Sequence, residues 1–415
     1  MSALPSPVLG LAFVVVVLCA VAGWIAVRYP RRVGRWVLVG LALRLAGSLA
    51  FLYGISALYG GGDYELYFRE GTAYAAELLG GEATLFATGA TWWGTAFVSR
   101  LAGLLFALIG PTLPGSFLVF SAIGFVGTLV FWTAACRAFP AMDARASLIW
   151  LMVFPSLWFW PSSLGKDSIV LLGLGLTVLG FVGTRGRTGW ATLLAGLLCV
   201  FVIRPQMVAI LVLSLVAGQV LSTLRGGTRG GIARVGLLVG AAAGALVLAS
   251  GALGIDLSDV EAVTDYVEAR AAGTSYGNSA ISTGENPLWL APITTLFRPL
   301  LWEADGPAAL VAAAETTFLW AAVWFRRRRV VAFLRVYRRS PLMWMGVVFV
   351  AVYAIAVGLS VANLGTLVRQ RIHLLPFLLL PVAGLRSEGR RALAPVPAQV
   401  VDARVSTGPP GGMEL

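Results

Sequence analysis

Apolar segments long enough to cross a membrane recur along almost the whole of this 415-residue chain. An α-helix needs about 20 consecutive apolar residues to span the hydrocarbon core of a bilayer. With 58% hydrophobic and only 12% charged residues, the composition is far from that of a soluble domain. The sequence therefore predicts an all-α fold, a polytopic transmembrane helix bundle.

Eleven segments have the length and composition of a membrane span. They are residues 8–27, 35–59, 115–136, 144–160, 168–184, 188–203, 207–223, 235–253, 306–325, 342–360 and 371–386. Residues 1–386 are thus predicted to form one transmembrane domain. The tail, residues 387–415, has no hydrophobic periodicity and is predicted to be disordered.

Arginine clusters between the spans predict the topology. They lie at residues 28–35, 137–145, 185–187, 225–234 and 326–339, and in the tail from residue 386. Because Lys and Arg concentrate in cytoplasmic loops, we assign these clusters and the C-terminus to the cytoplasm, which places 22 of the 31 basic residues there. This distribution also argues against nucleic-acid binding, despite a net charge of +12.

One further apolar segment, residues 92–110, is predicted not to span. Loop 60–91 is assigned outside and Arg137 inside, so only one of the segments 92–110 and 115–136 crosses. The first opens with Trp92 and Trp93 and contains Arg100, which is typical of a helix lying at the interface. The outer face then carries two large loops, 60–114 and 254–305, the first with an amphipathic helix over residues 63–80.

Most reactive side chains not needed for topology lie in the outer segments. They are Asp63 with its neighbour Tyr64, Lys166, Asp167, Arg204, Asn278, Arg298, Glu303, Arg369, Arg371 and His373. Lys166 is the only lysine of the chain, and His373 is the only histidine. Several arginine forks with one ammonium group suit a phosphate, and a nearby carboxylate can activate a hydroxyl as a general base.

Each of these residues also has an ordinary structural interpretation. Asp63 and Asp167 suit helix caps, span-end arginines anchor in lipid headgroups, and His373 suits a structural hydrogen bond. However, outer arginines lie on the side that the positive-inside rule depletes. The three cysteines, Cys19, Cys136 and Cys199, indicate neither a disulfide framework nor a metal site.

Two charged residues fall near the middle of predicted spans. Arg44 lies in the second span and Glu315 in the ninth. Because a charge at the bilayer centre is costly without a partner, we expect a structural Arg44–Glu315 ion pair.

The order of these features resembles the GT-C class of membrane glycosyltransferases, which use polyprenyl-phosphate-linked sugars. That class has an acidic motif on the first outer loop, then juxtamembrane helices, two crossings and a second outer acidic motif. Here "GGDYELY" with Asp63 matches the first motif, 92–110 the juxtamembrane helix and "GKD" with Asp167 the second. The stretches "FPSLWFWPSSLGKDS", "LFRPLLWEAD" and "NLGTLVRQR" are also similar to membrane proteins of bacterial surface-polysaccharide gene clusters.

The resemblance implies an enzyme of the plasma membrane that moves a sugar from a polyprenyl-phosphate donor to a hydroxyl of a glycan or lipid-linked acceptor. The reaction would occur on the extracytoplasmic face, with inversion. Asp63 would be the general base, and Lys166 with the outer arginines would hold the donor phosphate. Asp167 would orient Lys166 or the acceptor, and loop 271–287 would close over the site.

The chain departs from the class in its additional first span and in its second motif, which is Lys-Asp without Asp-x-Asp. Whether the protein uses a divalent cation as a cofactor therefore stays open.

Two other functions stay open. One is an O-antigen-type polysaccharide polymerase or ligase, which also uses outer arginines and a large outer loop. The other is a lipid or polysaccharide transporter, in which Arg44 and Glu315 would line a path.

Overall fold

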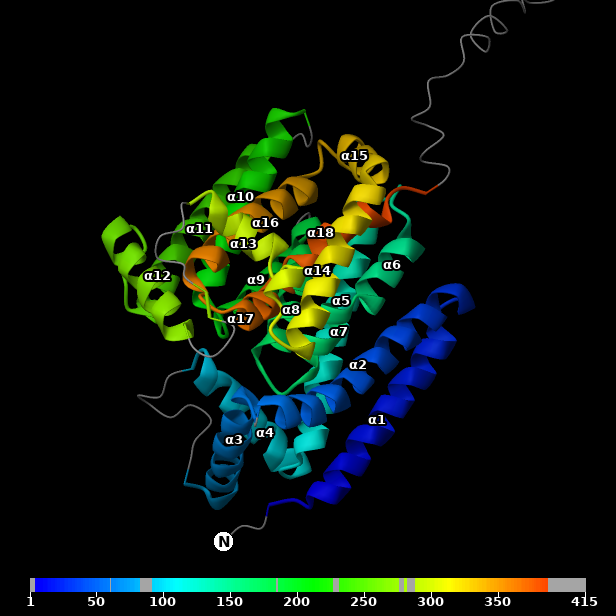
Figure 1. The fold of residues 1–415 in the computed structure, drawn as a ribbon, viewed down its shortest axis with the longest axis vertical. Coiled ribbons are helices and arrows are strands. Elements are labelled where there is room, and N and C mark those ends of the chain that lie inside the picture. Colours follow the sequence, from blue (N-terminus) through cyan, green and yellow to red (C-terminus); the bar gives the residue numbers. More distant parts are fainter. Residues whose placement is uncertain are drawn as a thin grey trace, which may run out of the picture.

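A computed structural model describes residues 4–59, 61–82, 92–183, 186–226, 231–275, 280–281 and 288–386. Within these residues the chain is almost entirely helical and forms no strand beyond two isolated bridges, Met142 with Leu385 and Ala280 with Asn363. The predicted all-α class is confirmed for this part of the chain. Figure 1 shows the helices as one bundle with shorter helices at its two ends.

The helices follow one another in this order: α1 Pro7–Arg28, α2 Arg31–Tyr59, α3 Asp63–Gly80, α4 Thr95–Ile109, α5 Leu113–Ala138, α6 Ala144–Val153, α7 Pro155–Phe159, η1 Trp160–Ser162, α8 Lys166–Gly183, α9 Arg187–Phe201, α10 Pro205–Leu224, α11 Gly231–Leu253, α12 Val260–Thr274, α13 Leu290–Phe297, η2 Leu301–Glu303, α14 Pro307–Phe325, α15 Arg327–Val336, α16 Pro341–Ser360, α17 Leu364–Arg371 and α18 Leu375–Ala383.

Eight of the described helices are long and apolar enough to cross a membrane. They are α1, α2, α5, α8, α10, α11, α14 and α16. Seven of the described α-helices have proline at one of their first two positions, where its missing N–H costs no hydrogen bond. The length and composition of these eight helices support the prediction of a multi-spanning helical protein.

Two predicted spans are broken rather than continuous. Segment 144–160 is divided at Phe154, whose extended backbone precedes Pro155, so α6 ends and α7 begins there. Segment 371–386 starts in the last residue of α17 and continues as the nine-residue α18. Proline lacks the N–H that would continue a helix and disfavours helical geometry in the residue before it, which explains the break at Pro155.

Glycines set the closest contacts between spanning helices. A Cβ at Gly175 of α8 would lie 2.4 Å from the carbonyl oxygen of Gly127 in α5. On the other side of α8, a Cβ at Gly180 would lie 2.2 Å from the backbone nitrogen of Leu193 in α9. Small residues let helix backbones approach in this way, so α5, α8 and α9 form the tightly packed centre.

One end of the bundle gathers loops that contain the predicted arginine clusters. The backbone N–H of Ala141 donates to the Tyr337 hydroxyl at 2.7 Å, and that of Arg386 donates to the carbonyl of Ala141 at 2.9 Å. Ser222 also donates to the carbonyl of Arg339 there, at 2.5 Å. We call this the arginine-rich end; it includes α15 and the α5–α6 turn in the upper part of Figure 1.

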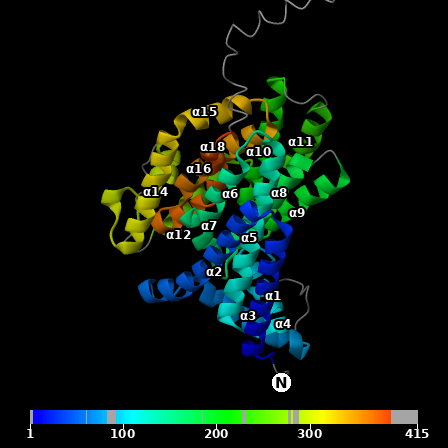
Figure 2. The ribbon, with the colours of Figure 1, turned by 90° about the vertical axis from the view of Figure 1, so that its right-hand side faces the viewer.

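The opposite, arginine-poor end carries α3, α4 and α12, as the turned view in Figure 2 shows for α3 and α4. The amphipathic helix predicted over residues 63–80 is α3, ended by Gly81 at φ 76°. Segment 92–110 forms α4, which is only 15 residues long and packs along α3. That this segment does not span stays a prediction, because α9, which we predict to span, has the same length.

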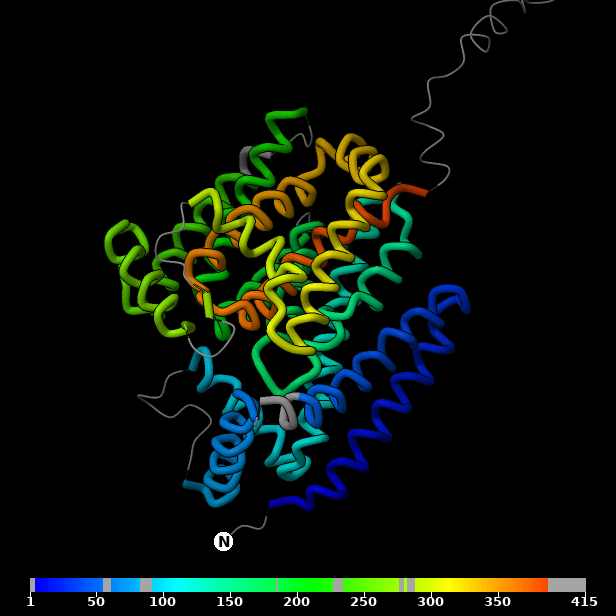
Figure 3. The backbone as a smooth tube through the Cα atoms, viewed as in Figure 1, coloured from blue at the N-terminus to red at the C-terminus, as the bar shows by residue number. Residues whose placement is uncertain are grey.

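A hairpin between α12 and α14 was not predicted. The Thr295 hydroxyl of α13 donates to the carbonyl of Ala354 in α16 at 2.7 Å, and Phe297 stacks on Trp320 of α14 with ring centroids 4.2 Å apart. The chain then returns through η2 to the first residue of α14 (Figure 3). Residues 290–306 therefore form a hairpin, and its residues 296–297 lie beside Trp320 of α14.

Candidate active site

Asp167, in the first turn of α8, is the centre of a charged cluster at the arginine-poor end. Its side chain is 2% exposed, and both of its oxygens accept from arginine. Arg204, just before α10, reaches Oδ1 at 2.9 Å through Nη2, and Arg369 of α17 reaches Oδ2 at 2.5 Å through Nε. Three distant parts of the sequence therefore meet at one carboxylate.

Asp63 is joined to the same cluster by Arg369. Nη1 of Arg369 lies 3.3 Å from Oδ2 of Asp63, while Nε of the same guanidinium binds Asp167. In contrast to Asp167, the side chain of Asp63 is 65% exposed. It lies in the first turn of α3, where the helix dipole stabilises a carboxylate. Asp63 is thus a water-accessible carboxylate beside a buried charge network.

Lys166 contacts a neutral group rather than an acid. Its ammonium donates to the Thr95 hydroxyl, at the start of α4, at 3.0 Å. No carboxylate among the residues that the structure describes lies within 4 Å of this ammonium. The positive charges of Arg204 and Arg369 are each matched by acids, so Lys166 carries the unneutralised charge of the cluster.

Behind the arginines lies a set of polar groups that the sequence did not single out. The Tyr353 hydroxyl of α16 donates to Oε1 of Gln370 at 2.9 Å, and Nη1 of Arg204 binds the same Gln370 oxygen. These groups hold the Arg204 guanidinium in place. A tyrosine within an apolar span and a glutamine between two arginines offered no sequence signal beyond their polarity.

His373 is fully buried behind Asp167. Its Nδ1 donates to the carbonyl of Gln370 at 2.8 Å, an assignment required because a carbonyl oxygen only accepts. Nε2 lies 3.9 Å from Oδ1 of Asp167, beyond hydrogen-bond distance. His373 therefore supports the cluster from behind, and its position agrees better with a structural role than with substrate contact.

Tyr67 was also missed by the sequence analysis. It lies one turn after Asp63 in α3, on the same face, and is 1% exposed. Burial, followed by the negative charge of Asp63, raises the pKa of Tyr67 above its ordinary value. Its phenol consequently stays protonated at neutral pH and remains a hydrogen-bond donor beside the two carboxylates.

Three predicted site residues lie elsewhere. Arg371 is two residues after Arg369 in α17, and because successive helical residues turn by about 100°, the two side chains leave opposite faces. Arg371 donates to Thr316 at 2.7 Å and to the carbonyl of Arg298 at 3.1 Å. Arg298 itself pairs with Glu303 at 2.7 Å within the hairpin. These three predicted substrate-site residues therefore contact one another and Thr316, and none of their described polar contacts is with Arg369.

Two further predicted residues have different outcomes. The Tyr64 ring is buried against Phe51 and Phe117, at 6.4 and 5.2 Å between ring centroids, so it packs α3 against the bundle. Asn278 lies outside the described residues, as does most of the expected closing loop 271–287.

The expected Arg44–Glu315 pair is wrong. Nη2 of Arg44 donates to the Thr128 hydroxyl at 2.6 Å, and Arg44 forms no ion pair with Glu315. Glu315 instead accepts from the backbone N–H of Ser156 at 2.9 Å. It also lies near enough to Arg371 for the two opposite charges to attract each other. The sequence placed both charges at mid-span but could not show which helices are neighbours.

The cluster does not fit a divalent cation. Such ions take several oxygen ligands, whereas both oxygens of Asp167 already accept from arginine and Asp63 faces Arg369. In the part of the chain that the structure describes, no group of three His, Cys, Asp or Glu side chains has the arrangement of a metal site.

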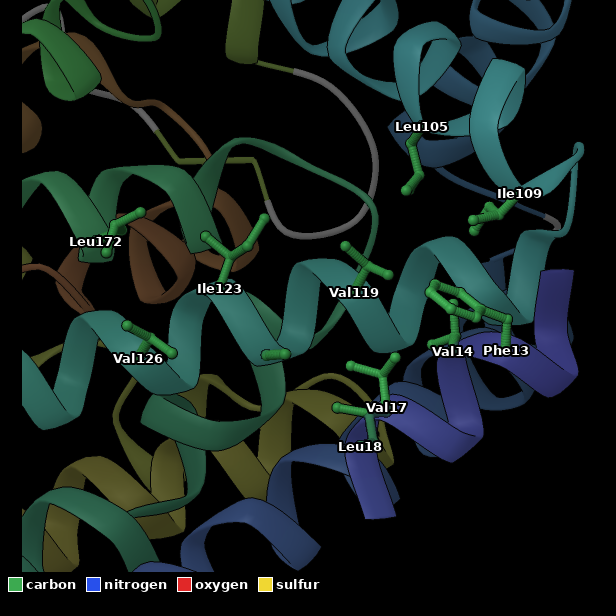
Figure 4. Close-up of a pocket in the computed structure, with 11 residues that line it drawn as sticks. Phe13, Val14, Val17, Leu18, Leu105, Ile109, Val119, Ile123, Val126 and Leu172 are labelled. Carbon is green, nitrogen blue, oxygen red and sulfur yellow. The ribbon is translucent and has the colours of Figure 1, made fainter. Parts of the chain in front are cut away.

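The cavities that we describe lie away from the cluster. One, of about 350 Å³, lies between α1, α4 and α5 and is lined only by apolar residues such as Phe13, Leu18 and Ile109 (Figure 4). The other, of about 500 Å³, lies between the 290–306 hairpin and α14. Neither is lined by Arg44 or Glu315, so neither is the charged central path expected of the transporter alternative.

Comparisons with family models, with curated proteins and with solved structures found no match for this chain.

Proposed function

We propose that this protein is a membrane glycosyltransferase that transfers a sugar from a polyprenyl-phosphate donor to an acceptor hydroxyl during cell-envelope glycan assembly. The observation that supports it is one cluster combining an exposed carboxylate, Asp63, with an ammonium that has no carboxylate contact, Lys166. The first suits a general base, and the second suits an anionic leaving group.

The proposed reaction breaks the bond between the sugar C1 and the phosphate oxygen and forms a bond from C1 to the acceptor oxygen. Asp63 accepts the proton of the acceptor hydroxyl as the new bond forms. Lys166 stabilises the negative charge on the departing phosphate. Asp167 acts indirectly, because it holds Arg204 and Arg369 in position.

The charge balance favours a monophosphate donor over a pyrophosphate donor. Asp63 and Asp167 balance the two guanidinium groups, which leaves one positive charge on Lys166. A sugar phosphodiester carries one negative charge and a pyrophosphate diester carries two. Single-sugar transfer is therefore our proposal rather than polymerisation from a lipid pyrophosphate.

Transfer can be tested with the purified full-length chain in proteoliposomes. Radiolabelled sugar would be supplied on polyprenyl monophosphate or on polyprenyl pyrophosphate, with envelope glycan as the acceptor. We expect label in single-addition products from the monophosphate donor. A product ladder from the pyrophosphate donor would indicate a polymerase or ligase instead, and no labelled product from either donor would contradict the proposal.

The finer topology belongs to the same proposal. We propose eleven crossings, with the broken segments 144–160 and 371–386 and the short α9 crossing in addition to the eight long helices. We further propose that the protein lies in the plasma membrane, with the arginine-poor end and its charged cluster on the extracytoplasmic side and the C-terminus in the cytoplasm.

A further inference from the structure

Helix α15 lies across the arginine-rich end of the bundle and is fixed there by aromatic packing. Phe333 is 1% exposed and contacts Phe139 at 5.1 Å between ring centroids. Tyr337, one turn later, packs on both rings and accepts a hydrogen bond from the backbone of Ala141 at 2.7 Å. The orientation of α15 is therefore set, and its other face points away from the protein.

The outward face combines positive charge with exposed apolar groups. Arg327, Arg328 and Arg335 are exposed on it, and Arg338 is exposed just after the helix ends. Between them, Val331 and Leu334 are also exposed, by 41% and 36%. The side chains of Trp324 and Phe325, the last two residues of α14, are 63% and 81% exposed.

These arginines have no acidic partner in the described chain. No Asp or Glu occurs between Glu315 and Glu388 in the sequence, and no described ion pair includes an arginine of residues 326–339. The acid nearest in sequence to the α5–α6 turn, Asp143, is used to cap α6. The positive charge of this face is therefore left for something outside the chain to neutralise.

Aromatic groups locate the same end at a membrane interface. The Arg327 guanidinium lies 4.8 Å above the Trp324 ring, and the Arg225 guanidinium lies 3.8 Å above the Trp344 ring. Trp344 also donates to the carbonyl of Arg338 at 2.8 Å. Tryptophan collects at the headgroup level of bilayers, so the α15 arginines face the phosphate layer.

We propose that the outward face of α15 binds anionic phospholipid headgroups. The arginines pair with lipid phosphates, and Val331 and Leu334 insert between the headgroups into the acyl-chain boundary. The exposed apolar pair favours a membrane over a water-soluble polyanion such as RNA, because a soluble polyanion would leave Val331 and Leu334 in water. This binding does not depend on the proposed transfer reaction.

Native mass spectrometry of the full-length chain tests this proposal. The protein is equilibrated in detergent micelles with equal amounts of phosphatidylglycerol and phosphatidylcholine that carry the same acyl chains. We expect wild type to retain phosphatidylglycerol preferentially. In the variant R335Q/R338Q, we expect the ratio of retained phosphatidylglycerol to retained phosphatidylcholine to fall roughly tenfold. A matched control, R69Q/R270Q, removes two exposed arginines at the opposite end and should keep the preference.

Three outcomes would overturn the proposal. They are equal retention of the two lipids by wild type, an unchanged preference in R335Q/R338Q, and an equal loss in the control. A short single-stranded RNA is offered in place of lipid in a separate measurement. Retention of RNA above that of phosphatidylglycerol would also contradict the proposal. Thermal unfolding in phosphatidylcholine alone verifies that both variants are folded before the lipids are compared.

Discussion

Asp63 and Asp167 differ in burial, and this difference predicts losses of stability of different size for the same substitution. Asp167→Asn removes the charge shared by two guanidinium groups in a site where the carboxylate is 2% exposed. Breaking a buried ion pair from one side costs about 3 kcal/mol or more. Asp63→Asn removes an exposed pair, which is worth about 1 kcal/mol at most. Thermal or denaturant unfolding in detergent should therefore separate the two variants clearly.

Lys166 offers a second prediction at the residue scale. Lys166→Arg keeps the charge but replaces a compact ammonium by a planar fork, next to the Thr95 hydroxyl that it contacts at 3.0 Å. We expect kcat/KM for the donor to fall about tenfold, and further in Lys166→Gln. A residue that only anchors in the interface would tolerate arginine, so unchanged kinetics in Lys166→Arg would assign Lys166 to anchoring.

The sequence allowed about half of this cluster to be predicted. Asp63, Lys166, Asp167, Arg204 and Arg369 were assigned to one end from topology alone, and all of them meet there. Arg371 was assigned to the same site because the helix boundary was placed at residue 371. Since α17 contains both Arg369 and Arg371, helical geometry directs their side chains to opposite faces. The roles of Tyr353 and Gln370 depend on tertiary contacts that no local pattern encodes.

The contact between α5 and α8 gives a prediction at the scale of elements. Gly175→Leu would place a side chain 2.4 Å from the Gly127 carbonyl, so the helices would have to separate. Overpacking of this kind costs about 1–3 kcal/mol, and because the obstacle is backbone we expect the upper part of that range. The yield of folded protein and its unfolding temperature should both fall.

Helix α11 supplies a matched control. A Cβ at Gly240 would meet no atom within 4 Å, although Gly240 also lies in the middle of an apolar helix long enough to span. Gly240→Leu should therefore leave folded yield close to that of wild type. If the two leucine variants behaved alike, the close approach of α5 and α8 would not be the cause.

Elements were predicted best where periodicity and length were unambiguous. The eight long apolar helices and α3 lie where hydrophobicity placed them. The 290–306 hairpin was missed, because its apolar residues form runs of fewer than ten and contain Pro292 and Pro299. Such a segment depends on contacts with α14, α16 and Arg371, which are distant in sequence.

For the whole molecule, the separation of the loops into two ends predicts a labelling pattern. In a variant without the three native cysteines, a single cysteine at Glu82 tests the arginine-poor end and one at Arg328 tests the arginine-rich end. We expect a membrane-impermeant thiol reagent added to intact cells to label only Glu82→Cys, and Arg328→Cys to react after permeabilisation. The reverse pattern would invert the proposed orientation.

The central claim is that Asp63 is the base for sugar transfer in a cluster built at one end of the bundle. The most direct measurement compares kcat for transfer from a polyprenyl-phosphate sugar by wild type, Asp63→Asn and Glu65→Gln. Both substitutions replace an exposed acid by its amide in the first turn of α3. We predict that Asp63→Asn loses at least about 100-fold in kcat and Glu65→Gln little, because a positioned general base contributes about 10²–10⁴. Wild-type turnover by folded Asp63→Asn would contradict the account.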